Sequence, residues 1–184
     1  MAIAINGAGT ITGISAGGLP DGVIQSADLA SGVGGKILQV VSSTKTDTFT
    51  TTSTSPVVAF SATITPSATS SKILLSGHFC QAHSGDANTP HLYRDSTEIC
   101  LADAYGSSRQ RGFIGSVKYE IGRTRQVSFS FVDSPSSTSA IVYSVKMACA
   151  SGSQTIYVGR SWNGGDDIWD GSGCSTMNLM EIGT

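Results

Sequence analysis

The residues with the clearest chemical potential lie in one loop near the end of the chain. The segment from Ser161 to Ser175 reads SWNGGDDIWDGSGCS and holds both tryptophans of the protein, three aspartates and several glycines. Indole faces stack on the C–H surfaces of sugar rings, and carboxylates accept hydrogen bonds from sugar hydroxyl groups. The loop therefore predicts a glycan- or receptor-binding site made of Trp162, Asn163, Asp166, Asp167, Trp169 and Asp170.

Two other interpretations of this loop stay open. The tryptophans could pack over the end of the domain or on a symmetry axis, with the aspartates left in solvent. Asp166 and Asp167 could instead help to hold Ca²⁺, although their spacing does not match an EF-hand loop.

No metal, cofactor or catalytic motif accompanies the loop. The cysteines show no CxxC spacing and no paired histidine motif occurs, so we expect no metal and no cofactor. No GxSxG nucleophile elbow is present, and we expect no enzymatic activity. We expect the cysteines to be small buried or half-buried residues rather than disulfides; they are Cys80, Cys100, Cys149 and Cys174. The histidines flank another loop, where we expect structural roles, with ion binding on a symmetry axis as the alternative; they are His78, His83 and His91.

The composition excludes several classes of partner. Only 11 Lys and Arg are spread over 184 residues and the net charge is −2, so the chain lacks the basic face that nucleic-acid binding needs. No apolar run reaches membrane-spanning length, so we expect no membrane insertion. The amino terminus lacks the basic and apolar regions of a signal peptide, so we expect folding in the cytoplasm where the chain is made.

Period-two alternation predicts an all-β fold. In the stretch Val127–Phe131 apolar and small polar side chains alternate strictly, which places the apolar set on one face of a strand. Similar runs recur at intervals of 8–15 residues with turn signals between them, which indicates an antiparallel β-sandwich or jelly-roll. We expect a loop over residues 81–89 and a loop over residues 105–110. The expected strands are residues 36–42, 57–65, 72–80, 91–94, 98–101, 111–120, 127–131, 141–145, 155–158 and 176–182.

The first 35 residues have a different character. They are rich in glycine and contain no aromatic residue, so they cannot build a core of their own. Their short apolar alternations suit strands that add onto a neighbouring copy or a larger assembly. We therefore expect an extended anchoring arm over residues 1–35 and a β-sandwich head over residues 36–184, with docking carried by Ile3, Ile5, Ile11 and Ile14.

Several blocks of the sequence resemble the β-sandwich domain of fibre and other virion structural proteins of tailed bacteriophages, notably marine and cyanobacterial ones. The resemblance covers about residues 35–184 and is specific in the order of its blocks. The blocks are GKILQVVSSTKTDTFTTTSTS, ITPSATSSKILL, LYRDSTEI, FSFVDSPSSTSAIVYSVK, TIYVGRS and the terminal LMEI. The glycine-rich INGAGTITGI opening is similar, more loosely, to phage fibre amino termini.

This resemblance implies a virion component that is a homotrimer and has no catalytic residues to transfer. The expected function is that of a short tail or head-surface fibre that displays the sandwich for attachment to a host-surface glycan. Its amino-terminal arm would bind other virion proteins. A capsid or tail decoration or adaptor protein without a receptor is the alternative, and a polysaccharide-degrading enzyme is a third class.

Overall fold

The structure, a computed structural model, describes residues 36–85, 88–106, 110–115, 122–165, 168 and 170–183. Within these ranges the regular elements are all β-strands, and no helix is long and apolar enough to span a membrane. The strands are β1 (Ile37–Lys45), β2 (Phe49–Thr51), β3 (Val57–Ile64), β4 (Lys72–His83), β5 (Asn88–Arg94), β6 (Thr97–Ile99), β7 (Arg125–Asp133), β8 (Ile141–Cys149), β9 (Ile156–Val158) and β10 (Ser175–Ile182).

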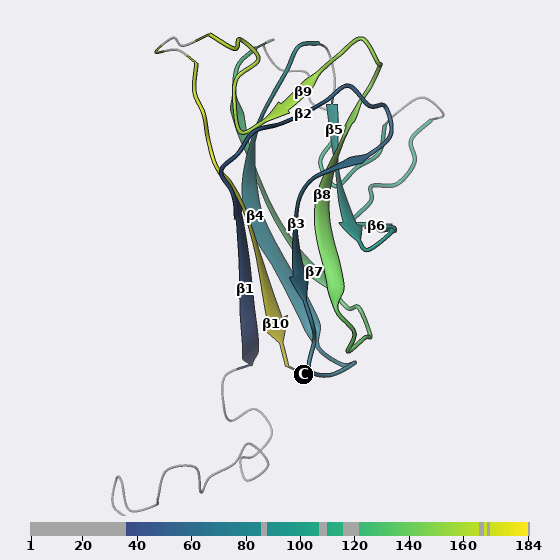
Figure 1. The fold of residues 1–184 in the computed structure, drawn as a ribbon. Helices are drawn as coiled ribbons and strands as arrows, with labels where there is room; N and C mark the ends of the chain where they lie inside the picture. Colours follow the sequence, from purple (N-terminus) through teal and green to yellow (C-terminus); the bar gives the residue numbers. More distant parts are fainter. Residues whose placement is uncertain are drawn as a thin grey trace, which may run out of the picture. The chain divides into compact units, whose positions relative to one another are not determined.

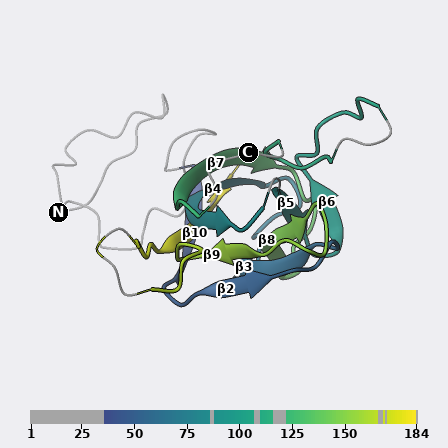
Figure 2. The ribbon, with the colours of Figure 1, turned by 90° about the horizontal axis from the view of Figure 1, so that it is seen from above.

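The strands form two antiparallel sheets that face each other as a jelly-roll-like sandwich (Figures 1 and 2). One sheet has the order β1-β10-β4-β9-β2, with β7 on the other side of β4, and the second has the order β3-β8-β5-β6. The chain crosses between the sheets repeatedly, since β3, β5, β6 and β8 belong to one and the remaining strands to the other. The all-β sandwich expected from the sequence is confirmed.

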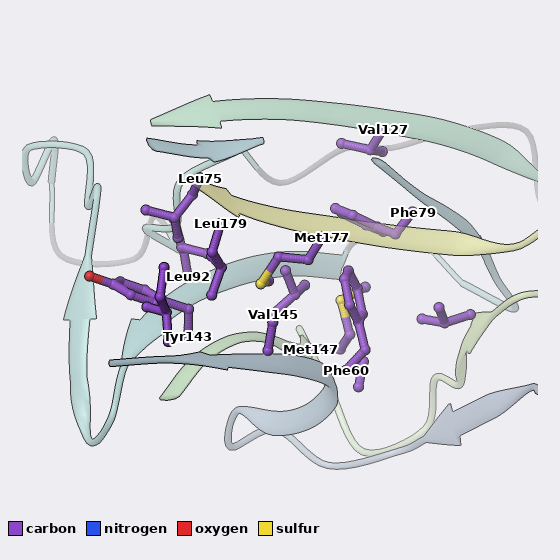
Figure 3. Packing of buried hydrophobic residues seen from close by; sticks show 14 of the residues in the cluster. Phe60, Leu75, Phe79, Leu92, Val127, Tyr143, Val145, Met147, Met177 and Leu179 are labelled. Atoms are coloured by element: carbon purple, nitrogen blue, oxygen red, sulfur yellow. The ribbon is translucent and has the colours of Figure 1, made fainter. Parts of the chain in front are cut away.

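Alternating side chains give the sandwich its core. Along β10, buried and half-buried residues alternate over all eight positions, so every second side chain points between the sheets. Figure 3 shows side chains from both sheets interdigitating, with Leu75, Phe79, Met177 and Leu179 of one sheet above Phe60, Tyr143, Val145 and Met147 of the other.

Two local predictions were wrong. The loop expected over residues 81–89 is shorter at both ends: β4 continues through His83 because β9 pairs with this part of the strand, and β5 begins at Asn88. Residues 111–120 were expected to form a strand, yet residues 111–115 form none, and residues 116–120 lie outside the described ranges. The Phe113 ring instead packs against Phe79 and Phe129, with centroids 6.4 and 5.6 Å away. This segment therefore covers one side of the core without joining a sheet.

The end of the sandwich that bears the carboxyl terminus is closed by a buried carboxylate, Glu181 (Figure 1). The side chain is fully buried, and its oxygens accept hydrogen bonds from the Ser67 amide (2.7 Å), the Ser67 hydroxyl (2.6 Å), the Ser71 hydroxyl (2.7 Å) and the Gln39 amide. Burial raises the pKa of Glu181, but the four hydrogen bonds outweigh this and lower the pKa to about 2. Glu181 thereby ties β10 to β1 and to the β3–β4 connection.

A second carboxylate, Asp133, joins the two sheets at the same end. Glu181 and Asp133 both pair with Ile73 of β4, so they lie in one row across β10, β4 and β7. The Arg94 guanidinium donates to both oxygens of Asp133 at 3.0 and 2.9 Å, and the Tyr143 hydroxyl donates to Oδ2 at 2.7 Å. Burial and the bond to Asp133 raise the pKa of Tyr143. We refer to Glu181, Asp133 and their partners as the carboxylate end.

Candidate functional site

The loop between β9 and β10 lies at the opposite end of the sandwich from the carboxyl terminus (Figure 1). Its two stems pair with each other through an isolated bridge between Arg160 and Ser172, and the Ser161 amide donates to the Gly171 carbonyl at 3.2 Å. The Gly159 amide donates to the Cys80 carbonyl of β4 at 2.9 Å. The base of the loop is thus fixed to the sheet. We call the described part of this loop, residues 159–165 and 170–174, with residues 122–124 beside it, the loop end.

Gly159 makes this attachment possible. Its φ is +85°, and a Cβ atom there would lie 3.1 Å from the Asp47 carbonyl oxygen. A residue with a side chain would suffer both backbone strain and this close contact. Position 159 therefore favours glycine at the end of β9, where the loop leaves the sheet.

Ser161 and Asp170 link the two sides of the loop. The buried Ser161 hydroxyl lies 3.1 Å from both the Asn163 carbonyl oxygen and Oδ1 of Asp170 and donates toward these two acceptors. Oδ2 of Asp170 is buried and has no hydrogen-bond partner among the described residues. It lies 3.3 Å from where a Cβ of Gly165 would be. Asp170 therefore serves first to close the loop.

Trp162 is partly exposed to solvent and partly packed against a neighbouring segment. Its side chain is 46% exposed, while one edge of its ring packs on Gly122, whose Cβ would lie 3.2 Å from Trp162 Cε3. Gly122 has φ +89°, and its carbonyl accepts a hydrogen bond from the Trp162 amide at 3.5 Å. The indole is thus supported from behind and still available on the outside.

Sequence analysis missed two residues at the first stem of the loop, Tyr157 and Arg160. The Arg160 guanidinium lies 4.5 Å from the centroid of the Tyr157 ring, in a cation–π arrangement. Arg160 Nη1 also lies 3.6 Å from the position that a Cβ of Gly164 would take. The sequence gives only a slight indication of this pair, because Tyr157 is the outward residue of a short strand and Arg160 follows at the start of the loop.

The structure brings together three of the six predicted site residues, Trp162, Asn163 and Asp170. The other three, Asp166, Asp167 and Trp169, lie outside the described ranges, as do the docking candidates Ile3, Ile5, Ile11 and Ile14. Within the described ranges no group of three His, Cys, Asp or Glu residues could hold a metal ion. Chemically, the loop end offers an exposed indole, a stacked guanidinium and the polar side chain of Asn163, with no arrangement for bond cleavage among these residues.

The other chemically interesting residues are dispersed. His91 Nδ1 lies 2.7 Å from Glu98 Oε1, whereas His83 is buried at the far end of β4. All four cysteines are free thiols. Cys149 is buried and Cys80 half-buried as expected, but Cys100 and Cys174 are exposed because each lies just outside a strand rather than in the core.

Comparisons with known proteins found similar solved structures and no matching family. No protein-family model matches the chain, and no curated protein matches it. Among solved structures, the VP2 subviral particle of infectious bursal disease virus is 16% identical over 79% of this chain, with a TM-score of 0.39. The Gx and Gt strains of that virus give 13% and 12% identity over 79% and 80% of this chain, each with a TM-score of 0.40. The chain spans 32 to 42% of the length of these proteins, and we base no functional argument on likeness at this level.

Proposed function

We propose that this protein is a structural component of a virion, a short bacteriophage fibre whose β-sandwich is displayed for attachment to a host-surface glycan. The observation that carries the receptor part is the arrangement at the loop end. Trp162 is half exposed, is backed by Gly122 and stands on a loop stem bonded to β4. An aromatic face held in place loses little conformational entropy when a sugar ring stacks on it.

The polar neighbours of Trp162 suit an oligosaccharide. Arg160 and Asn163, within two residues of Trp162 along the chain, supply hydrogen-bond donors, and hydroxyl-rich ligands need such donors at fixed positions. These donors are few, so one site alone would bind a glycan weakly. A homotrimer that presents three such sites would gain through effective concentration, which is the role we propose for assembly.

The virion part of the proposal rests on the ordered sequence blocks that resemble phage fibre proteins. The arm over residues 1–35 would attach the sandwich to other virion proteins through Ile3, Ile5, Ile11 and Ile14. Removal of residues 2–14 should then abolish incorporation into particles while the sandwich still folds. Particles that retain the truncated chain would contradict this docking role.

Binding of the purified protein to arrayed bacterial surface glycans tests the receptor role. Trp162→Ala should reduce binding at least tenfold, because stacking on one sugar ring is lost. Tyr105→Ala is the matched control, since Tyr105 is a 74% exposed aromatic residue in the segment after β6. Equal binding by both variants would contradict the proposed site.

The second candidate is a decoration or adaptor protein without a receptor. The packing of the Trp162 ring on Gly122 favours it, because in such a protein the tryptophan has only a structural role. It predicts that Trp162→Ala particles adsorb to cells normally but lose stability. We further propose that the protein is not an enzyme, and release of reducing sugar ends from a polysaccharide by the purified chain would contradict this.

A further inference from the structure

The outward face of the six-stranded sheet carries an apolar row that no part of the described chain covers. Val40, Met180, Leu74 and Val132 pair in register across β1, β10, β4 and β7. All four occupy the phase of their strands that points away from the core. Val40 is 57% exposed and Val132 is 49% exposed, so the two ends of the row face solvent.

The row extends toward the start of β1. Ile37 pairs with Ile182, and the β-bulge after Ile37 leaves both Ile37 and Leu38 exposed, at 57% and 51%. The Leu38 side chain reaches over the chain end, where a Cβ of Gly183 would lie 3.3 Å from Leu38 Cδ1. Apolar residues thus form a contiguous outer patch instead of the isolated ones that ordinary surfaces show.

The next two rows of this face are polar but carry no carboxylate, ammonium or guanidinium group. They are Ser42, Asn178, Ser76 and Ser130, followed by Thr44, Thr176, His78 and Ser128. Lys72 pairs with Ile182 and lies at the margin of these rows. We call these three rows, with Ile37, Leu38 and Ile182, the outer sheet face.

Strand β1 adds a second feature to this face. It is the edge of its sheet in the described structure, and its nine residues include one charged residue, Lys45. Edge strands usually carry charges or prolines that discourage pairing with other chains. The first seven residues of β1 have neither, so both the edge and the face at this corner are open to another protein surface.

We propose that the outer sheet face is the surface through which copies of this chain bind one another. Further copies of the chain suit it because such faces can gather about a symmetry axis without burying a charge, and apolar and hydroxyl rows of neighbouring copies can lie against each other. A charged peptide or polysaccharide would find no ionic partner within these rows. This inference rests on the assembly in the proposed function and assigns it a surface.

The size of the face agrees with this role. Four strands at about 4.8 Å spacing and about eight residues at about 3.3 Å each give a projected area of about 500 Å². Standard interfaces bury about 800 Å² on each partner, with an apolar centre and a polar rim. The outer sheet face can therefore supply the central part of such an interface, with the β1 edge contributing the remainder.

Sedimentation velocity of the full chain, with circular dichroism to monitor folding, tests the proposal. The wild type should sediment as a multiple of 18.9 kDa. Val40→Lys and Val132→Lys, both exposed positions, should keep the β-rich spectrum and fall to the mass of one chain. Val142→Lys is the matched control, because Val142 is 40% exposed on the outward face of the other sheet, and it should leave the mass unchanged.

A wild type that sediments as one chain, or an oligomer that survives both lysine variants, would overturn the proposal. Its failure can be distinguished from failure of the receptor role. A single-chain species that still binds glycan through Trp162 would reject the interface alone. An oligomer that dissociates in Val40→Lys but binds no glycan would support the interface and reject the receptor.

Discussion

The two ends of the sandwich use carboxylates in opposite ways. At the carboxylate end, Glu181 accepts four hydrogen bonds and Asp133 accepts from Arg94 and Tyr143, so both are fully engaged in holding strands together. At the loop end, Asp170 accepts from one hydroxyl and keeps Oδ2 without a partner among the described residues. The carboxylates of one end are fully hydrogen-bonded within the protein, whereas the other end keeps an unpaired carboxylate oxygen and a half-exposed indole.

This difference shows how the molecule can separate stability from recognition. A buried carboxylate costs several kcal/mol unless hydrogen bonds replace its hydration, so the saturated end is fixed by folding itself. The loop end leaves its indole and donors to solvent, where a ligand can use them. We therefore expect substitutions at the carboxylate end to change the free energy of unfolding and those at the loop end to change binding.

The largest effect should come from Glu181→Ala. The substitution leaves the Ser71 hydroxyl and the Ser67 amide without their acceptor and opens a cavity in the sandwich, so the free energy of unfolding should fall by about 3 kcal/mol. Urea titration followed by tryptophan fluorescence measures this. Glu98→Ala, at a carboxylate near the surface, is the control and should cost about 1 kcal/mol. Equal losses in both variants would contradict the special role of the carboxylate end.

Acid should weaken the same end. The folded-state pKa of Glu181 is lowered from 4.5 to about 2, so its stabilisation is complete above about pH 4.5 and disappears as the pH falls toward 2. At about 1.4 kcal/mol per pH unit the difference amounts to about 3 kcal/mol, and we expect about 2 because Ser67, at the rim, is exposed and lets water screen the site. Urea midpoints between pH 6 and pH 2 measure this. Glu181→Gln should flatten the dependence, and an unchanged slope in that variant would assign it to other groups.

Tyr143→Phe should have a smaller effect. It removes the hydroxyl that donates to Asp133 Oδ2 but leaves the Arg94 pair and the ring packing in place, so we expect a loss of about 1–2 kcal/mol. Thermal unfolding of Tyr143→Phe, Arg94→Lys and the double variant would measure the coupling between the two donors. Strictly additive losses would show that Asp133 does not join them into one network.

Trp162→Ala should have the smallest effect on stability, below about 1 kcal/mol, because the side chain is already half exposed. Its effect on glycan binding should nevertheless be larger than that of any variant at the carboxylate end. Parallel measurement of unfolding and of glycan binding across Trp162→Ala and Tyr143→Phe tests the division between the two ends directly. If Trp162→Ala lowered the free energy of unfolding as much as Glu181→Ala, the separation of stability and binding between the two ends would be contradicted.

How far each region could be predicted depends on whether its partners are local. The alternation in β7, β8 and β10 located these strands, because a half-buried strand needs only its own pattern to be recognised. Residues 81–83 were placed in a loop because Gln81 and His83 are polar, yet both are buried through pairing with a strand more than seventy residues later. The glycines of the loop end identified it as a loop. The sequence did not indicate that Gly122 supports the Trp162 ring.

Glu181 shows the same limit at the other end. It stands at an inward position of β10, where the pattern alone would place an apolar residue, and its partners Gln39, Ser67 and Ser71 lie 110 to 142 residues away. No spacing rule connects such distant positions. The free-energy cost of burying the Glu181 carboxylate could be judged only once the fold showed which groups donate hydrogen bonds to it.

The sequence by itself determined that this chain forms an all-β sandwich and that its richest chemistry is concentrated between the last two strands. These properties follow from side-chain alternation and from local composition, which act over a few residues. The tertiary structure alone decided which carboxylates hold the fold together, how Trp162 is supported at the loop end and which sheet face the described part of the chain leaves uncovered. Those properties depend on the free energy of burial, which is set by residues that meet only when the chain has folded.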